Sequence, residues 1–100
     1  MINAGNTSDV PNFGKKVVSL GGREILLVHI KETFYAVENE CPHQGCPMTA
    51  AVVKEGTISC PRHGYRFSLV DGTCREHPES VLTVFPVVLE GETILVDLPE

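Results

Sequence analysis

Short apolar stretches occur along most of the chain, and glycine, proline or charged residues separate them. Residues 16–20 and 24–30 are rich in apolar and β-branched side chains, and the Gly21-Gly22 pair between them is typical of a two-residue hairpin turn. In residues 24–30, apolar side chains fall on both faces of the predicted strand, so we expect this strand to be covered on both sides.

Further strands are predicted at residues 33–37, 81–89 and 93–98, the last two being joined by a turn at residues 90–92. Because Pro86 lies inside residues 81–89, that strand should lie at a sheet edge or carry a bulge. No stretch of ten residues shows a helical period with caps. The pattern therefore predicts an all-β fold, a small barrel or sandwich of antiparallel strands.

The first dozen residues are polar and are interpreted as a loose lead-in. A length of 100 residues and a hydrophobic content of 42% fit a single globular domain over residues 1–100. The net charge of −5 argues against a nucleic-acid partner, because phosphate binding needs an excess of lysine and arginine. A positively charged patch on a partner protein fits better.

The N-terminal residues show no basic region, no apolar signal-peptide core and no twin arginine, so no export signal is visible. No apolar run approaches the roughly 20 residues needed to cross a bilayer. We therefore expect a soluble, cytoplasmic protein without membrane contact. In that compartment, four cysteines in so short a chain indicate metal or redox chemistry before structural disulfides.

Two compact blocks combine a thiol and an imidazole within a Gly/Pro-rich turn. The first holds Cys41 and His43, and the second holds Cys60 and His63. Sixteen residues separate His43 from Cys60. The stretch 49–59 within this separation is predicted to form a hairpin that brings the two blocks side by side.

Two metal centres accept such a set of ligands. Zinc binds two cysteines and two histidines, but its usual blocks are C-x2-4-C and H-x3-5-H, whereas here each block is mixed. Mixed blocks place the cysteines together and the histidines together when they meet. That division suits a dinuclear cluster in which one iron takes two thiolates and the other takes two imidazoles. A structural zinc site in an interaction module remains the alternative.

With these blocks the sequence resembles the Rieske ferredoxin family, from about residue 17 to the C-terminus. The resemblance implies one [2Fe–2S] cluster, a fold of stacked antiparallel sheets, and a cluster-binding part at about residues 38–80 formed by two loops. It assigns the buried iron to the two cysteines of the blocks, the iron nearer solvent to the two histidines, and a covering loop to the region of Pro78.

The sequence departs from the high-potential branch of this family at several positions. Cys46 stands where that branch has the first cysteine of a disulfide, but Arg62 replaces the second, so the bridge cannot form. Tyr65 and Phe67 stand where serine and tyrosine hydroxyls donate hydrogen bonds toward sulfur in that branch. Fewer donors stabilise the reduced cluster less, so we expect a reduction potential of about −150 mV.

The function implied by the resemblance is one-electron transfer from a reductase to a terminal oxygenase, by a protein that is monomeric and is not itself an enzyme. The small subunit of an assimilatory nitrite reductase is the alternative within the fold. The exposed histidine ligands would pass the electron. The surrounding docking surface is predicted to comprise Gln44, Gly45, Pro47, Met48, Gly64 and Tyr65.

The other cysteine and histidine residues are not expected to bind the cluster. Cys46 and Cys74 are interpreted as small, partly buried thiols. His29 lies in a predicted strand and is interpreted as a packed or surface side chain, and His77 as a solvated loop residue.

Overall fold

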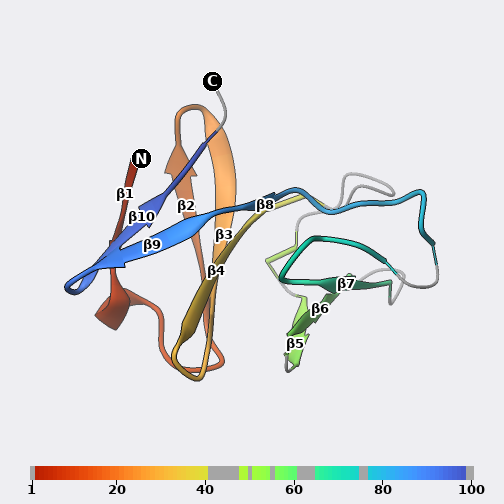
Figure 1. Ribbon diagram of the computed structural model, residues 1–100, viewed down its shortest axis with the longest axis horizontal. Helices are drawn as coiled ribbons and strands as arrows, with labels where there is room; N and C mark the ends of the chain where they lie inside the picture. Colours follow the sequence, from red (N-terminus) through yellow and green to blue (C-terminus); the bar gives the residue numbers. More distant parts are fainter. Residues whose placement is uncertain are drawn as a thin grey trace.

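The computed structural model describes residues 2–40, 48–49, 51–54, 56–60, 65–74 and 77–98. Within these residues the chain forms three antiparallel sheets and no α-helix (Figure 1). The first sheet has the strand order β1-β10-β9, with β1 at Ile2–Asn6, β9 at Val87–Glu90 and β10 at Thr93–Val96. The predicted all-β class is confirmed.

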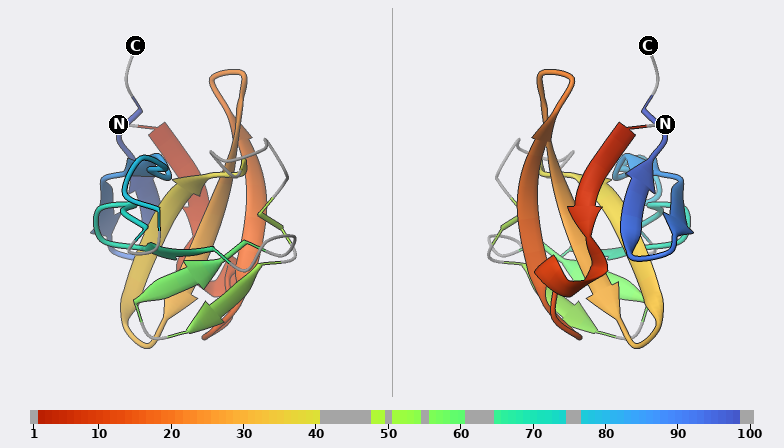
Figure 2. Two further views of the ribbon diagram at one scale, coloured as in Figure 1. Left: turned by 90° about the vertical axis from the view of Figure 1, so that its right-hand side faces the viewer. Right: turned by 90° about the vertical axis from the view of Figure 1, so that its left-hand side faces the viewer.

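The second sheet has the order β2-β3-β4-β8, with β2 at Lys15–Leu20, β3 at Arg23–Ile30, β4 at Thr33–Glu38 and β8 at Val84–Phe85. The third has the order β5-β6-β7, with β5 at Val52–Lys54, β6 at Thr57–Ser59 and β7 at Arg66–Ser68. The two side views show the third sheet on one side of the second and the first sheet on the other (Figure 2).

Strand β3 is covered on both faces, as its sequence predicts. Ile25 and Leu27 point into a cluster shared with the first sheet, whereas Leu26, Val28 and Ile30 point into a cluster shared with the third. All five side chains are at most 5% exposed. With both apolar faces buried, β3 packs against the first sheet on one side and the third sheet on the other.

The predicted hairpins are also present. β2 pairs with β3 around Gly21 and Gly22, whose φ angles of 56° and 80° suit glycine. β5 pairs with β6, which confirms the hairpin predicted between the two ligand blocks. A further tie runs from the second sheet to the start of this hairpin, because the Lys15 ammonium donates a hydrogen bond to the carbonyl oxygen of Ala51.

The interpretation of the first dozen residues as a loose lead-in is wrong. β1 pairs with β10 at the opposite end of the sequence, and a 3-10 helix follows at Thr7–Asp9. Ala4 and Val10 are buried in the cluster between the first and second sheets. Since the partner strand is so far away in the sequence, the local composition gives no signal of this pairing.

The single strand predicted at residues 81–89 is also corrected. Pro86 separates β8 from β9, and these two short strands belong to different sheets. Proline has no N–H to continue a ladder, so the chain can leave one sheet and enter the next at this point. Both strands lie at the edge of their sheets, which confirms the predicted edge position.

Within the part of the chain described above, no helix is long and apolar enough to cross a membrane.

Candidate metal centre

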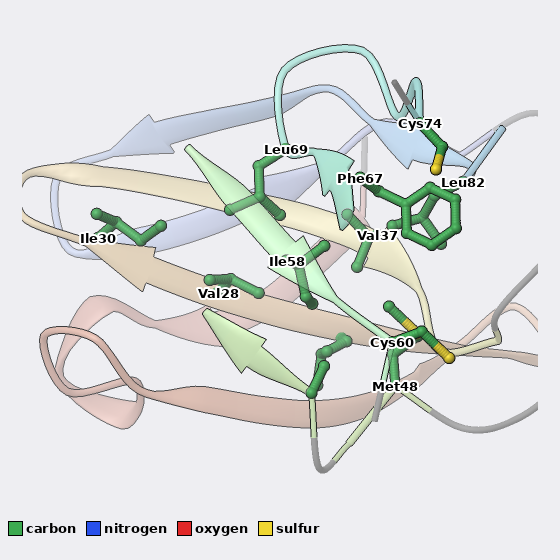
Figure 3. Close-up of a cluster of buried hydrophobic side chains, with 12 residues drawn as sticks. Val28, Ile30, Val37, Met48, Ile58, Cys60, Phe67, Leu69, Cys74 and Leu82 are labelled. Carbon is green, nitrogen blue, oxygen red and sulfur yellow. The ribbon is translucent and has the colours of Figure 1, made fainter. Parts of the chain in front are cut away.

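Of the four predicted ligands, only Cys60 belongs to the described residues. It directly follows β6, is 2% exposed, and lies in the cluster between the second and third sheets (Figure 3). Cys41, His43 and His63 lie outside the described residues. The ligand set as a whole therefore stays a prediction, and its structural setting is given by the residues that flank the two blocks.

The flanks of the first block are joined by a side chain. Asn39 follows β4, and its Oδ1 accepts a hydrogen bond of 2.8 Å from the backbone N–H of Met48. The chain thus leaves the second sheet at Asn39 and returns beside it at Met48, with residues 41–47 in between. The ends of the predicted first ligand segment are held together.

The flanks of the second block are joined through the backbone. The N–H of Cys60 donates a hydrogen bond of 2.7 Å to the carbonyl oxygen of Tyr65, which continues the pairing of β6 with β7. Residues 61–64 lie between them in the sequence. The second ligand segment therefore starts and ends at the tip of one hairpin.

Both segments start or end in the same buried cluster. Met48 closes the first segment and is fully buried, and Cys60 opens the second. Figure 3 draws their sulfur-bearing side chains at the end of the cluster away from Ile30. The fold thus brings the flanks of two segments that are separate in the sequence into one place.

Cys60 is as deeply buried as Cys74 in the same cluster, and its assignment as a ligand comes from the spacing of its block. Its neighbours in the cluster are mainly apolar, among them Met48, Ile58 and Phe67. A charged thiolate is costly to bury without a compensating positive charge, and bound iron supplies one. Elsewhere among the described residues, no group of three or more histidine, cysteine or acidic side chains is arranged to hold a metal ion.

A second contact fastens the far end of the second segment. The ring of Tyr65 stacks on the imidazole of His77, with 3.9 Å between the ring centroids. The His77 Nδ1 atom lies 3.4 Å from a carboxylate oxygen of Glu79. His77 is a loop residue with a side chain 36% exposed, as its interpretation as a solvated loop residue expects in part, but its ring also packs against the chain that leaves the second ligand block.

The predicted docking surface is corrected at one position. Met48 is 0% exposed and belongs to the core, so it cannot contact a partner. The burial of Met48 follows from its position next to Asn39 and not from its residue type. Tyr65 is partly exposed. The other four predicted docking residues lie outside the described residues, namely Gln44, Gly45, Pro47 and Gly64.

The remaining histidine and cysteine predictions can be compared with the structure at two residues. His29 is packed as expected, because its Nδ1 lies 2.8 Å from the carbonyl oxygen of Val10 and its ring stacks on Phe34. Since a carbonyl oxygen only accepts, the proton must be on Nδ1. Cys74 is 2% exposed, which confirms its burial, whereas Cys46 and Arg62 lie outside the described residues.

Asn39 is the residue of the site that the sequence analysis missed. An asparagine directly after a strand and two residues before a cysteine is a usable signal, since asparagine often bonds to nearby backbone at such positions. Its partners Glu24 and Met48 lie elsewhere in the chain, however, so the contacts follow only from the fold.

Comparison with known proteins agrees with this geometry. The family model described as "Rieske [2Fe-2S] domain" matches residues 1–86. Apoptosis-inducing factor 3 of Homo sapiens is 33% identical over 92 residues, which are 91% of this chain, but the chain spans only about 15% of that protein's length. The 3-phenylpropionate/cinnamic acid dioxygenase ferredoxin subunit of Escherichia coli K12 is 35% identical over 78 residues, covering 76% of this chain and 74% of the relative.

Solved structures show the same fold. The ferredoxin of carbazole 1,9a-dioxygenase from Nocardioides aromaticivorans IC177 superimposes with a TM-score of 0.86 at 23% identity, covering 95% of this chain and 94% of that one. A Mycobacterium tuberculosis protein assigned as the small subunit of an NADH-dependent nitrite reductase gives 0.85 at 22% identity, covering 95% and 91%. The predicted stacked antiparallel sheets are confirmed. The chain belongs to the Rieske [2Fe–2S] domain family, whose domain binds one [2Fe–2S] cluster per chain.

Proposed function

We propose that this protein is a one-electron carrier, the ferredoxin component that takes electrons from a reductase and passes them to a terminal oxygenase. The observation that carries the proposal is the convergence of the two ligand segments. The second and third sheets place the flanks of these segments together at the buried Cys60. When bound, the [2Fe–2S] cluster supplies a centre that gains and loses one electron.

The proposal assigns the ligands as Cys41 and Cys60 on one iron and His43 and His63 on the other. Two thiolates balance the charge of an oxidised cluster core, whereas four thiolates would leave the site negative. Adding an electron to a neutral site costs less, so imidazole ligands raise the reduction potential above that of an all-cysteine site. The buried position of Cys60 supports its assignment to the inner iron.

The relatives support a carrier more than a catalytic subunit. The match with the naphthalene 1,2-dioxygenase ferredoxin component of Pseudomonas aeruginosa covers 90% of this chain and 88% of that relative. Nearly the whole of a ferredoxin component therefore has a counterpart in this chain. We also propose that the carrier acts in the cytoplasm and is a monomer.

A second candidate is the small subunit of a nitrite reductase. The fold of the Mycobacterium tuberculosis protein matches this chain almost as closely as that of the carbazole dioxygenase ferredoxin, with TM-scores of 0.85 and 0.86. In either case the chain would supply the electron path and not the substrate site. The difference lies in the partner that accepts the electron.

Stopped-flow absorbance tests the proposal. The purified protein, reduced by NADH and the reductase component of a dioxygenase system, is mixed with either the terminal oxygenase of that system or a sirohaem nitrite reductase. We expect one electron per chain to be taken up and then lost rapidly to the oxygenase. Rapid oxidation by the nitrite reductase alone would favour the second candidate. A colourless protein that contains zinc and no iron would contradict both.

A further inference from the structure

We infer that Asn39 is a positioning residue for the metal centre, because its side chain closes the first ligand segment. This inference rests on the ligand assignment proposed above, in which Cys41 and His43 lie in residues 41–47. Asn39 itself is not placed as a ligand. It acts through the two ends of the segment.

The side-chain oxygen of Asn39 holds the far end of the segment. Oδ1 accepts hydrogen bonds from the backbone N–H of Met48 at 2.8 Å and from the Thr49 hydroxyl at 3.2 Å. Asn39 is 8% exposed and Met48 is fully buried. A buried N–H that loses its acceptor is costly, so this bond fixes where the chain re-enters the core.

The side-chain nitrogen of Asn39 anchors the same amide to the central sheet. Nδ2 donates to the Glu24 carboxylate at 3.2 Å, and the Asn39 backbone N–H donates to the Glu24 carbonyl oxygen at 3.0 Å. Since a carboxylate only accepts and a backbone N–H only donates, the orientation of the amide follows from its partners. Asn39 thus connects strand β3 to Met48 across the mouth of the ligand segment.

Few other residues can replace asparagine in this arrangement. Aspartate keeps the acceptor for Met48 but has no proton for Glu24, and it places two carboxylates next to each other. Alanine removes all three side-chain hydrogen bonds and leaves the Met48 N–H without its acceptor. The position requires one donor and one acceptor on a short, rigid side chain.

The second ligand segment needs no such residue. Its four residues, 61–64, are closed by the backbone bond between Cys60 and Tyr65. The first segment has seven residues, 41–47, and its ends are brought together by the Asn39 side chain. The longer a chain segment is, the more conformational entropy is lost when its ends are brought together. The hydrogen bond between Met48 and Asn39 offsets part of that cost before metal binds.

The test compares Asn39→Ala, Asn39→Asp and the double variant Asn39→Asp/Glu24→Gln as purified holoproteins. Two quantities are measured: the rate at which an iron chelator removes the cluster, and the low-temperature EPR spectrum of the reduced protein. We expect Asn39→Ala and Asn39→Asp to lose iron about tenfold faster or more, with a broadened or shifted EPR spectrum. The double variant should recover most of both properties, because the introduced glutamine amide can donate to the introduced carboxylate.

Ile94→Val is the matched control, because it weakens the cluster between the first and second sheets, which contains neither Met48 nor Cys60. It should lose stability and keep the wild-type iron-release rate and EPR spectrum. The inference is overturned if Asn39→Ala behaves like wild type, if the double variant releases iron as fast as Asn39→Asp, or if Ile94→Val releases iron as fast as Asn39→Ala. If Asn39→Ala does not fold, the comparison between Asn39→Asp and the double variant decides. A wild-type protein without iron would instead refute the proposed function.

Discussion

The phenol ring of Tyr65 lies nearly parallel to the imidazole of His77, with 3.9 Å between the ring centroids and an angle of 19° between the planes. Tyr65 ends the second ligand segment, and His77 begins the turn that contains Pro78. The stack therefore joins the site to the part of the chain that the family resemblance interprets as its cover.

Removal of this stack should loosen the cover without removing the cluster. We expect His77→Ala to lower the free energy of unfolding by about 1 kcal/mol, in line with the value of an aromatic pair. His77→Phe keeps an aromatic partner for Tyr65 and should therefore retain most of the free energy of unfolding that His77→Ala loses. Urea denaturation of the holoproteins measures the difference. Equal stability of the alanine and phenylalanine variants would show that the stack contributes nothing.

Glu79→Gln provides the control for the charge next to this stack. The Glu79 side chain is 72% exposed, so its contact with His77 should contribute only a few tenths of a kcal/mol. A loss as large as that of His77→Ala would mean that charge, and not ring stacking, holds the turn.

Gly72 should be the least replaceable glycine of the described residues. Its φ is +81°, and a Cβ built on it would overlap the carbonyl oxygen of Leu82. That oxygen is backbone, so Gly72→Ala has to displace the chain between β7 and β8. We expect a loss of more than about 3 kcal/mol, or no folded protein at all.

Gly56→Ala is the matched substitution for Gly72. Gly56 has a similar φ of +72°, but nothing lies within 4 Å of a built Cβ. Only the backbone conformation is strained there, at a cost of about 1–2 kcal/mol. Thermal unfolding of the two variants should differ clearly. Equal losses would contradict the close approach of Gly72 to Leu82.

Removal of iron should affect the two halves of the molecule unequally. Cys60 belongs to the cluster between the second and third sheets, whereas Ala4, Ile94 and Val96 belong to the cluster on the other side of β3. We expect hydrogen exchange in the apoprotein to accelerate in β5, β6 and β7 and to stay close to the holoprotein rate in β1 and β10. Uniform acceleration in all strands would show that the metal stabilises the fold as a whole.

The midpoint potential should lie near the low end of the Rieske range, about −150 mV. Phe67 is fully buried and offers no hydroxyl to the sulfur atoms of the site. The missing second cysteine at Arg62 leaves the two segments without the bridge of the high-potential branch. Protein-film voltammetry measures this value directly. A potential above roughly +100 mV would contradict the assignment to the low-potential branch.

The sequence predicts those parts of the fold whose signals are local. The two apolar faces of β3 and the Gly21-Gly22 turn can each be predicted from residues that are adjacent in the sequence, and both predictions are confirmed. The pairing of β1 with β10 is not local, because it depends on a strand at the other end of the chain. Similarly, Pro86 signals an interrupted strand, but the transfer from one sheet to another depends on how the sheets pack.

The site shows the same division. The spacing of the two blocks predicts the ligands and a [2Fe–2S] cluster, and the match to the Rieske [2Fe–2S] domain agrees with the predicted cluster. The burial of Met48, which was expected on the docking surface, follows from its bond to Asn39 and from packing against Cys60. Such contacts join residues from separate parts of the chain, so no pattern within one segment reveals them.

The ligand assignment also predicts the outcome of four cysteine and histidine substitutions. His43→Cys and Cys60→Ser should abolish the ordinary Rieske spectrum, because each removes a proposed ligand. Cys46→Ser and Cys74→Ser should leave it intact. Loss of the cluster in Cys46→Ser would show that this cysteine is required at the site.

The most direct test of the central claim is pulsed EPR of the reduced protein labelled with ¹⁵N-histidine. Two directly bound imidazole nitrogens should couple to the reduced cluster, and chemical analysis should find about two irons and two sulfides per chain. The coupling should persist in His29→Gln and His77→Phe, because neither residue is a proposed ligand. A cluster without strong nitrogen coupling, or a chain that holds zinc in place of iron, would contradict the claim.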